Sequence, residues 1–171
     1  MDIKKKLQNY IDNNINATFV SFKKARYAVE RDCCISSARL EDVEYGEANL
    51  DNYINNNKDD NKFQKLLFKY IDDKNLKDSD VYNKVGIDRR LFSKIRSDKD
   101  YHPSKETVIL LAIALELSED ELEDLLLSAA YSLPMNNHYD LIIRFCFKEN
   151  IYDLFTINEY LSDYSCKPLS C

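Results

Sequence analysis

Residues 76–96 read LKDSDVYNKVGIDRRLFSKIR, and this stretch decides the fold. Its apolar residues have the spacing of a buried helix face both before and after Gly86. They are Val81, Val85, Leu91, Phe92 and Ile95. Glycine adopts a positive φ without steric cost, so Gly86 is suited to a sharp turn between two short helices. Asp88 is suited to cap the second one. The stretch therefore predicts helices over residues 78–85 and 88–97.

The second of these helices has a basic side. Once its apolar residues are turned inward, the side chains left toward solvent are Arg89, Arg90, Ser93, Lys94 and Arg96. Arginine and lysine are the side chains best suited to guanine edges and phosphates. Between residues 84 and 105 there are seven Lys or Arg and three Asp, a local sum of +4 in a chain of net charge −6. Because charge runs are also common on ordinary solvated surfaces, an inert helix face is the alternative.

Helical spacing continues on both sides of this stretch. Phe63, Leu66, Leu67, Tyr70 and Ile71 predict a helix before it. Residues 104–117 contain VILLAIAL, which is apolar on all sides and typical of the buried centre of a helical bundle.

Three further helices are predicted toward the C-terminus. Ser118 and Glu121 form a capping box, and the apolar stripe behind it predicts a helix that runs as far as Pro134. The next helices are predicted at 137–149 and at 156–164, the second with Thr156 and Glu159 as a capping box. The tail SCKPLSC, residues 165–171, is predicted to be loose.

The N-terminal third is less regular. Residues 3–15 have one apolar helix face, and residues 17–31 favour a helix. We predict an irregular segment at residues 32–47. The apolar residues within 50–54 indicate a short helix. Residues 55–61, NNNKDDN, read as a linker. Because the whole chain holds two Gly and three Pro, we expect helices joined by short turns, and therefore an all-α fold.

These features resemble the Cro and lambda-repressor (XRE-type) family of helix-turn-helix domains. The resemblance lies in the stretch 76–96, the following Pro103, the apolar VILLAIALEL at 108–117 and the capped SEDELEDLL at 118–126. It implies a five-helix helix-turn-helix core at residues 62–133. More narrowly, residues 63–169, and VYNKVGIDRRLFSKIRSDKDYHPSK within them, are similar to an uncharacterised bacterial domain sometimes found behind macrodomains.

The resemblance implies a DNA-binding regulator that uses the helix at 88–97 for recognition. Its base-facing residues would be Arg89, Arg90, Ser93 and Lys94, and its phosphate contacts Arg96, Lys99, Tyr101 and Lys105. If four phosphates were neutralised, a plot of the logarithm of the DNA-binding constant against the logarithm of the salt concentration would have a slope of about −3.6. Family members normally bind two half-sites as homodimers. Either residues 137–164 or the N-terminal segment would supply that contact, and the sequence leaves both open.

Three departures from the family pattern weaken DNA binding, and two of them, Tyr82 and Asp78, together with the net charge of −6 favour an alternative function as an acidic protein-binding module, such as an adaptor, an antitoxin-like protein or an inhibitor. Tyr82 stands where the family usually has a small residue, so it must change the packing or point outward. Asp78 stands where the family often has Gln, and a carboxylate there repels DNA. Its simplest role is that of a helix N-cap. Residues 98–102 lengthen the loop after the recognition helix.

Other function classes have no support in the sequence. There is no phosphate loop, no nucleophile elbow and no HExxH, so we expect no catalytic residues. The chain has two His and no paired CxxC, which predicts no metal site, and no cofactor motif is present. No apolar run reaches the ~18 residues that a membrane span needs.

The five cysteines are odd in number and follow no signal peptide, so reduced thiols in the cytoplasm are expected. The adjacent Cys33 and Cys34 predict no site of their own. Cys146 lies in an apolar helix and is expected in the core. We divide the chain into an N-terminal segment (1–57), a helix-turn-helix domain (62–133), a two-helix extension packed on it (136–165) and a tail (166–171).

Overall fold

The computed structural model describes residues 3–15, 62–98 and 100–170, which form eight helices and no strand. The all-α prediction is confirmed for this part of the chain. The predictions made for residues 17–61, including those for Cys33 and Cys34, lie outside the described residues.

The helices begin and end close to the predicted positions, with one exception at α7. The first runs over residues 3–15. The others are α3 (Lys62–Asp73), α4 (Asp78–Lys84), α5 (Arg89–Ser97), α6 (Lys105–Ala114), α7 (Glu119–Ser128), α8 (His138–Lys148) and α9 (Leu154–Asp163).

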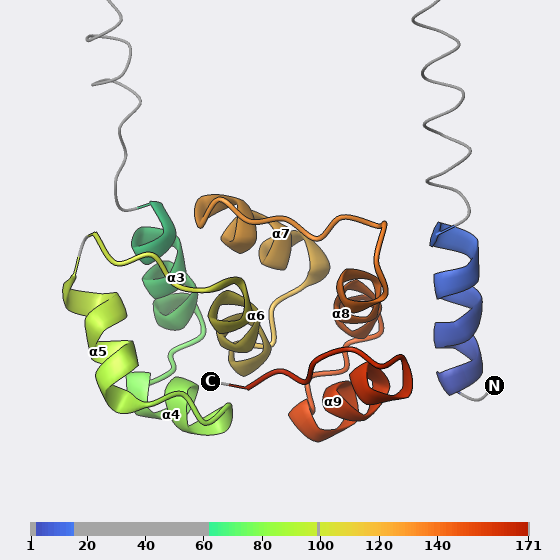
Figure 1. The fold of residues 1–171 in the computed structure, drawn as a ribbon. Helices are drawn as coiled ribbons and strands as arrows, with labels where there is room; N and C mark the ends of the chain where they lie inside the picture. The colour runs from blue at the N-terminus through green and yellow to red at the C-terminus, as the bar shows by residue number, and fades with distance from the viewer. Residues whose placement is uncertain (1–2, 16–61, 99, 171) are drawn as a thin grey trace, which may run out of the picture.

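Helix α6 lies at the centre, with α4 and α7 packed against it and α3 packed against α7 (Figure 1). Every residue from Thr107 to Ala114 is buried. The prediction that this apolar helix forms the middle of the bundle is therefore confirmed. One buried cluster continues from α3 through α6 and α7 into α8 and α9.

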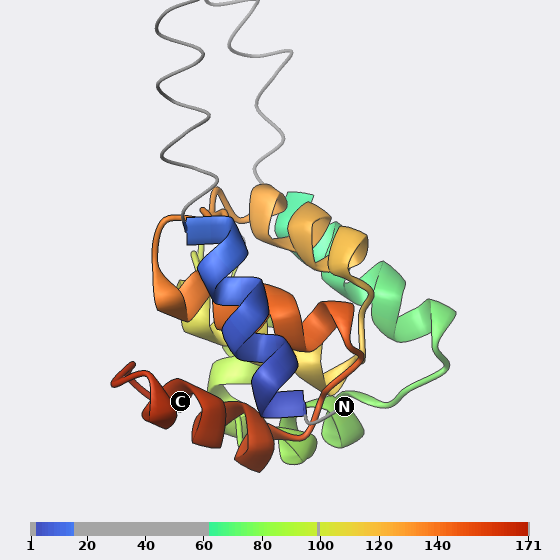
Figure 2. The ribbon, with the colours of Figure 1, turned by 90° about the vertical axis from the view of Figure 1, so that its right-hand side faces the viewer.

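The helix at residues 3–15 lies against α8 and α9, on the side of the molecule away from α5 (Figures 1 and 2). Leu7 and Ile11 are buried, and the ring of Tyr10 lies 5.5 Å from that of Phe145. The Nζ atom of Lys4 lies 2.7 Å from a carboxylate oxygen of Glu159 on α9. The described part of the N-terminal segment therefore leaves α5 uncovered.

Helix α7 ends at Ser128, so the prediction that it continues to Pro134 is wrong. Ala130 adopts a left-handed φ of 56°. The N–H of Tyr131 then donates to the carbonyl of Leu126 (2.8 Å), and the N–H of Ala130 donates to that of Leu127 (3.0 Å). This pair of hydrogen bonds is a Schellman motif, which satisfies the last carbonyls and turns the chain away from the helix axis.

Helix α9 begins before the predicted capping box. Its N-cap is Asp153, whose carboxylate accepts from the N–H of Thr156 (2.8 Å) and from its hydroxyl (2.7 Å). These hydrogen bonds, the one from the side chain of Thr156 first, hold the pKa of Asp153 below its ordinary value. Thr156 is thus the residue that donates to the cap, and the prediction that it is the cap is wrong.

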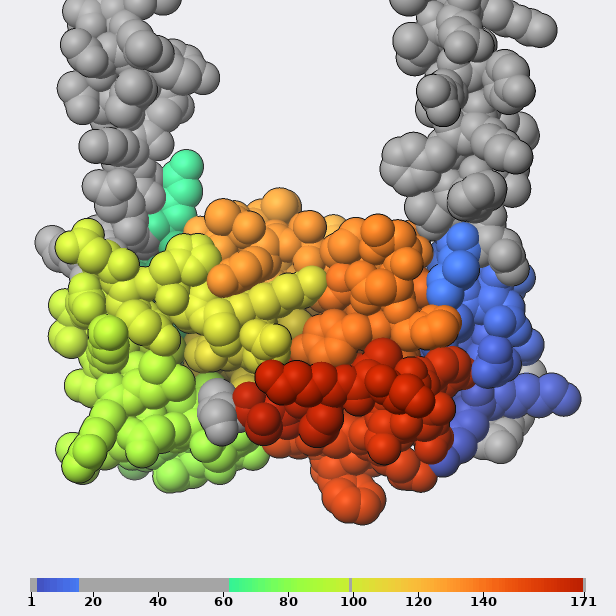
Figure 3. Space-filling view, viewed as in Figure 1, coloured from blue at the N-terminus to red at the C-terminus, as the bar shows by residue number. Residues whose placement is uncertain are grey.

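The C-terminal tail is anchored. Leu169 is buried, and the side chain of Asn158 bonds both its N–H (2.7 Å) and its carbonyl (3.2 Å). In the space-filling view this red segment lies across the face of the molecule (Figure 3). The predicted loose tail is therefore wrong for residues up to Leu169.

Cys146 is buried in α8, as predicted, and burial raises the pKa of its thiol to about 12. At pH 8 the thiol is therefore protonated as well as shielded, and only the thiolate reacts quickly with alkylating reagents. We expect iodoacetamide to leave Cys146 unmodified in the native protein and to modify it in denaturant, as read by peptide mass spectrometry. Modification at equal rates in both conditions would contradict this burial.

Candidate nucleic-acid interface

The turn between α4 and α5 is built around Gly86, which has a φ of 70°. The N–H of Ile87 donates to the carbonyl of Tyr82 (2.9 Å), which closes the end of α4. Asp88 caps α5, as predicted, because its carboxylate accepts from the N–H of Arg90 (2.6 Å). Two short helices are thus joined in the way that the sequence predicts.

Gly86 is needed here for its backbone alone, because a Cβ added at this position would meet nothing within 4 Å. We expect Gly86→Ala to destabilise the protein by about 1–2 kcal/mol, because in the left-handed conformation the Cβ atom of an L-residue lies too close to the following carbonyl oxygen. Ala130→Gly is the matched reverse change at φ 56° and is expected to stabilise the protein. Urea unfolding measures both, and a neutral Gly86→Ala would contradict the turn.

Helix α5 presents a basic surface to solvent. Phe92 and Ile95 are buried and Leu91 is half-buried, so the opposite side of the helix faces outward. Among the exposed residues there are Arg89, Arg90, Ser93 and Lys94, which we call the α5 basic face. Within the described residues, the side chains of Arg89 and Arg90 form no hydrogen bond or ion pair. The Nζ of Lys94 lies 4.6 Å from the centre of the half-buried Tyr101 ring.

Arg96 is held at the edge of this face. One guanidinium nitrogen donates to Asp78 of α4 at 2.6 Å, and the group lies 4.1 Å from the centre of the Phe68 ring. The N-cap of α4 is Lys77, so the prediction that Asp78 caps this helix is wrong. Asp78 is instead the ion-pair partner of Arg96.

Two other bases of the stretch 84–105 also have carboxylate partners. The Nζ of Lys105 lies 2.6 Å from Asp140 of α8, whose side chain is only 4% exposed. Lys84 is 2.5 Å from Glu116, and its hydrogen bond lowers the pKa of that carboxyl. Lys105 is therefore committed to an internal ion pair, and we leave it out of the proposed contact surface. Lys99 lies outside the described residues.

The local sum of +4 thus overstates the charge available to a ligand. Among the described bases of this stretch, Arg89, Arg90 and Lys94 have no carboxylate partner. The sequence predicted that all three face solvent. It did not reveal the ion pairs that neutralise the others.

A cleft of about 400 Å³ lies between α4 and α5, beside the α5 basic face. Tyr82 and Phe92 contribute aromatic rings, 5.6 Å apart between centres. The half-buried Tyr82 therefore packs against α5, where the family resemblance expected a small residue. The residues lining the cleft are Lys77, Asp78, Ser79, Tyr82, Arg89, Phe92, Ser93 and Arg96.

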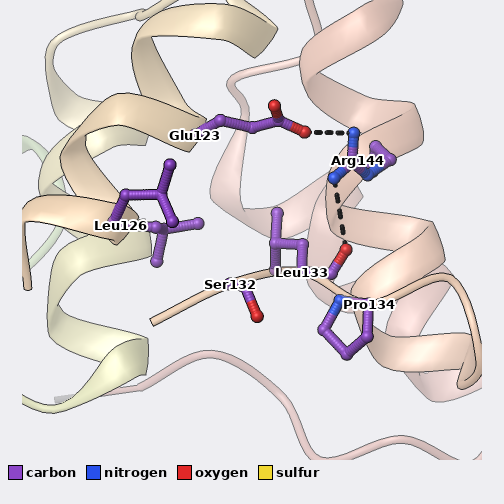
Figure 4. Close-up of a pocket in the computed structure, with 7 residues that line it drawn as sticks. Glu123, Leu126, Ser132, Leu133, Pro134 and Arg144 are labelled. Atoms are coloured by element: carbon purple, nitrogen blue, oxygen red, sulfur yellow. Dashed lines mark hydrogen bonds and ion pairs between the residues drawn. The ribbon is translucent and has the colours of Figure 1, made fainter. Parts of the chain in front are cut away.

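A second hollow, of about 190 Å³, lies between α7 and α8 (Figure 4). Arg144 borders it, and its guanidinium donates to the carbonyl of Leu133 (3.2 Å) and to Glu119 (3.0 Å). Glu123 is its third partner. Arg144 and its two carboxylates together carry a net charge of −1. The hollow itself is largely apolar, with the exposed Leu127 at its edge.

The described residues contain no group of three or more His, Cys, Asp or Glu placed to hold a metal ion. None of their helices has the length and apolar character to cross a membrane. Comparison with protein-family models, curated proteins and solved structures found no match to the chain.

Proposed function

We propose that the protein is a helix-turn-helix DNA-binding protein that acts as a transcriptional regulator. Helices α4 and α5 would form the helix-turn-helix, with α5 as the recognition helix. The observation that carries the proposal is the α5 basic face. It places two arginines without partners among the described residues, and a lysine, on one exposed side of a helix whose other side is buried.

The dimensions of α5 suit a DNA groove. With its side chains an α-helix is about 10–12 Å across, which matches the width of the major groove, about 12 Å. Arg89 and Arg90 lie in its first turn, where a helix that enters the groove by its N-terminal end brings side chains to base edges. The planar guanidinium pairs with the O6 and N7 atoms of guanine through two hydrogen bonds.

Lys94 follows Arg90 by one helical turn, so both point to the same side of α5. Contact by this side would also bring Ser93 near the bases, and the cleft between α4 and α5, which Ser93 lines, would lie beside the DNA backbone. In keeping with the family resemblance, we propose a homodimer that places two such helices on neighbouring half-sites.

The test is a fluorescence-anisotropy titration of the full chain against a pool of mixed-sequence 20-base-pair duplexes at low salt. Three cations that displace counterions predict a log–log salt slope of about −2.7, from 0.9 for each. Binding with this slope would support the proposal. No binding at high micromolar protein would overturn it.

A second candidate function is the acidic protein-binding module. The observation that favours it is Leu127, which is 65% exposed beside the hollow between α7 and α8. The first turn of α7 is acidic, with Glu119, Asp120 and Glu121. A partner with an apolar anchor and basic flanks would fit this surface. Failure of DNA binding in the titration, with Leu127→Ser abolishing capture of a co-purifying protein, would select this function.

A further inference from the structure

We propose that Asp78 limits the affinity of the α5 basic face for DNA phosphates by pairing with Arg96. This inference rests on the proposed DNA-binding function. Asp78 would set both the affinity of this surface for DNA and the salt dependence of that affinity.

The geometry keeps Arg96 beside the cleft. Asp78 and Arg96 come from different helices, α4 and α5, and meet at 2.6 Å. Contact with the Phe68 ring holds the guanidinium from a second side. Both partners line the same cleft as Arg89 and Ser93, so they lie at the edge of the α5 basic face.

The pair is exposed enough to open. The side chain of Arg96 is 52% exposed and that of Asp78 is 36% exposed. Exposed ion pairs change an equilibrium constant by about fivefold at most, so Arg96 is able to exchange Asp78 for a phosphate. The carboxylate then stays in the cleft and repels that phosphate. The two residues together contribute no net charge to the surface, whereas Arg96 alone would contribute +1.

Asp78 is not needed to start α4. Lys77 is the N-cap, and the first turn is closed by Asp80, which accepts from the N–H of Lys77 at 3.3 Å. Asp78→Asn keeps the size of the side chain and removes only its charge. The substitution is therefore expected to leave the fold and the α5 basic face intact, and a thermal melt checks this.

We expect Asp78→Asn to tighten binding to the mixed duplex pool about three- to fivefold at low salt, with the slope steeper by about 0.9, from about −2.7 to about −3.6. Asp120→Asn makes the same change in net charge from the exposed first turn of α7 and should shift the affinity less than twofold. Adding Arg96→Gln to Asp78→Asn should remove the gain.

The outcomes separate this inference from the proposed function. Binding by the native protein with no change in slope or affinity in Asp78→Asn would overturn the role of Asp78 and leave the function standing. An equal gain in Asp120→Asn, or a gain that survives Arg96→Gln, would also overturn it. Absence of binding by both the native protein and Asp78→Asn would overturn the inference and the function together.

Discussion

Replacement of Arg90 and Lys94 together by alanine is expected to weaken binding to duplex DNA about 100-fold, while the protein stays folded. Both side chains are exposed, and neither has a carboxylate partner among the described residues. Each cation that displaces counterions changes the logarithm of the binding constant by about 0.9 per tenfold change in salt, so at roughly 0.08 M salt the loss of two such cations lowers the affinity about 100-fold. Because neither side chain packs in the core, the unfolding free energy should change by less than about 0.5 kcal/mol.

The matched control removes two exposed lysines elsewhere, Lys5 in the helix at residues 3–15 and Lys167 in the C-terminal segment. It changes the net charge by the same amount as the double alanine variant. Anisotropy titrations at one salt concentration compare the two. If the control loses as much affinity, binding follows total charge, and the α5 basic face has no special role.

Lys105→Ala is expected to destabilise the fold by about 2–4 kcal/mol. Its partner Asp140 has a side chain that is 4% exposed, and without Lys105 this carboxylate keeps only the amide of Asn137, at 2.8 Å, as a side-chain partner. Removal of one member of a buried ion pair leaves an uncompensated charge, which usually costs about 3–5 kcal/mol. We expect a smaller loss of unfolding free energy than this usual range because the Lys105 side chain is 25% exposed. Urea unfolding measures the loss.

The control for this prediction is the double variant Lys105→Met with Asp140→Leu, which replaces both charged residues by apolar ones. A hydrophobic replacement of a whole buried pair is often neutral or stabilising, so most of the lost stability should return. A Lys105→Ala protein as stable as the native one, with weakened DNA binding, would instead make Lys105 a ligand contact.

The helices themselves were predictable because burial imposes a period. The all-round apolar character of residues 108–115 marked the centre of the bundle, and the spacing of Phe92 and Ile95 placed the arginines of α5 outward. Side-chain capping was also readable where Ser118 and Glu121 stand at the required spacing.

Helix ends were less predictable because glycine marks only one of them. Left-handed residues follow six helices, and they are Asn75, Gly86, Glu116, Ala130, Asn150 and Ser165. Glu and Ala have no preference for this conformation, so nothing in the sequence near Ala130 signalled the end of α7. Pro134 is the nearest helix breaker in the sequence, so the sequence predicts the end of α7 there.

The ion pairs of the site depend on tertiary packing. Asp78 and Arg96 are 18 residues apart, and Lys105 and Asp140 are 35 apart. Sequence periodicity shows which side of a helix faces outward, but not which neighbouring helix supplies a carboxylate. The count of basic residues was therefore available from the sequence, whereas the number left free was not.

Contact between the α5 basic face and DNA can be observed residue by residue through amide chemical-shift mapping. The measurement titrates the isotope-labelled full chain with the mixed duplex pool and follows each backbone amide. We expect the largest shifts at residues 89–94 and small shifts along α9. Shifts centred on the hollow between α7 and α8, with residues 89–94 unchanged, would contradict it.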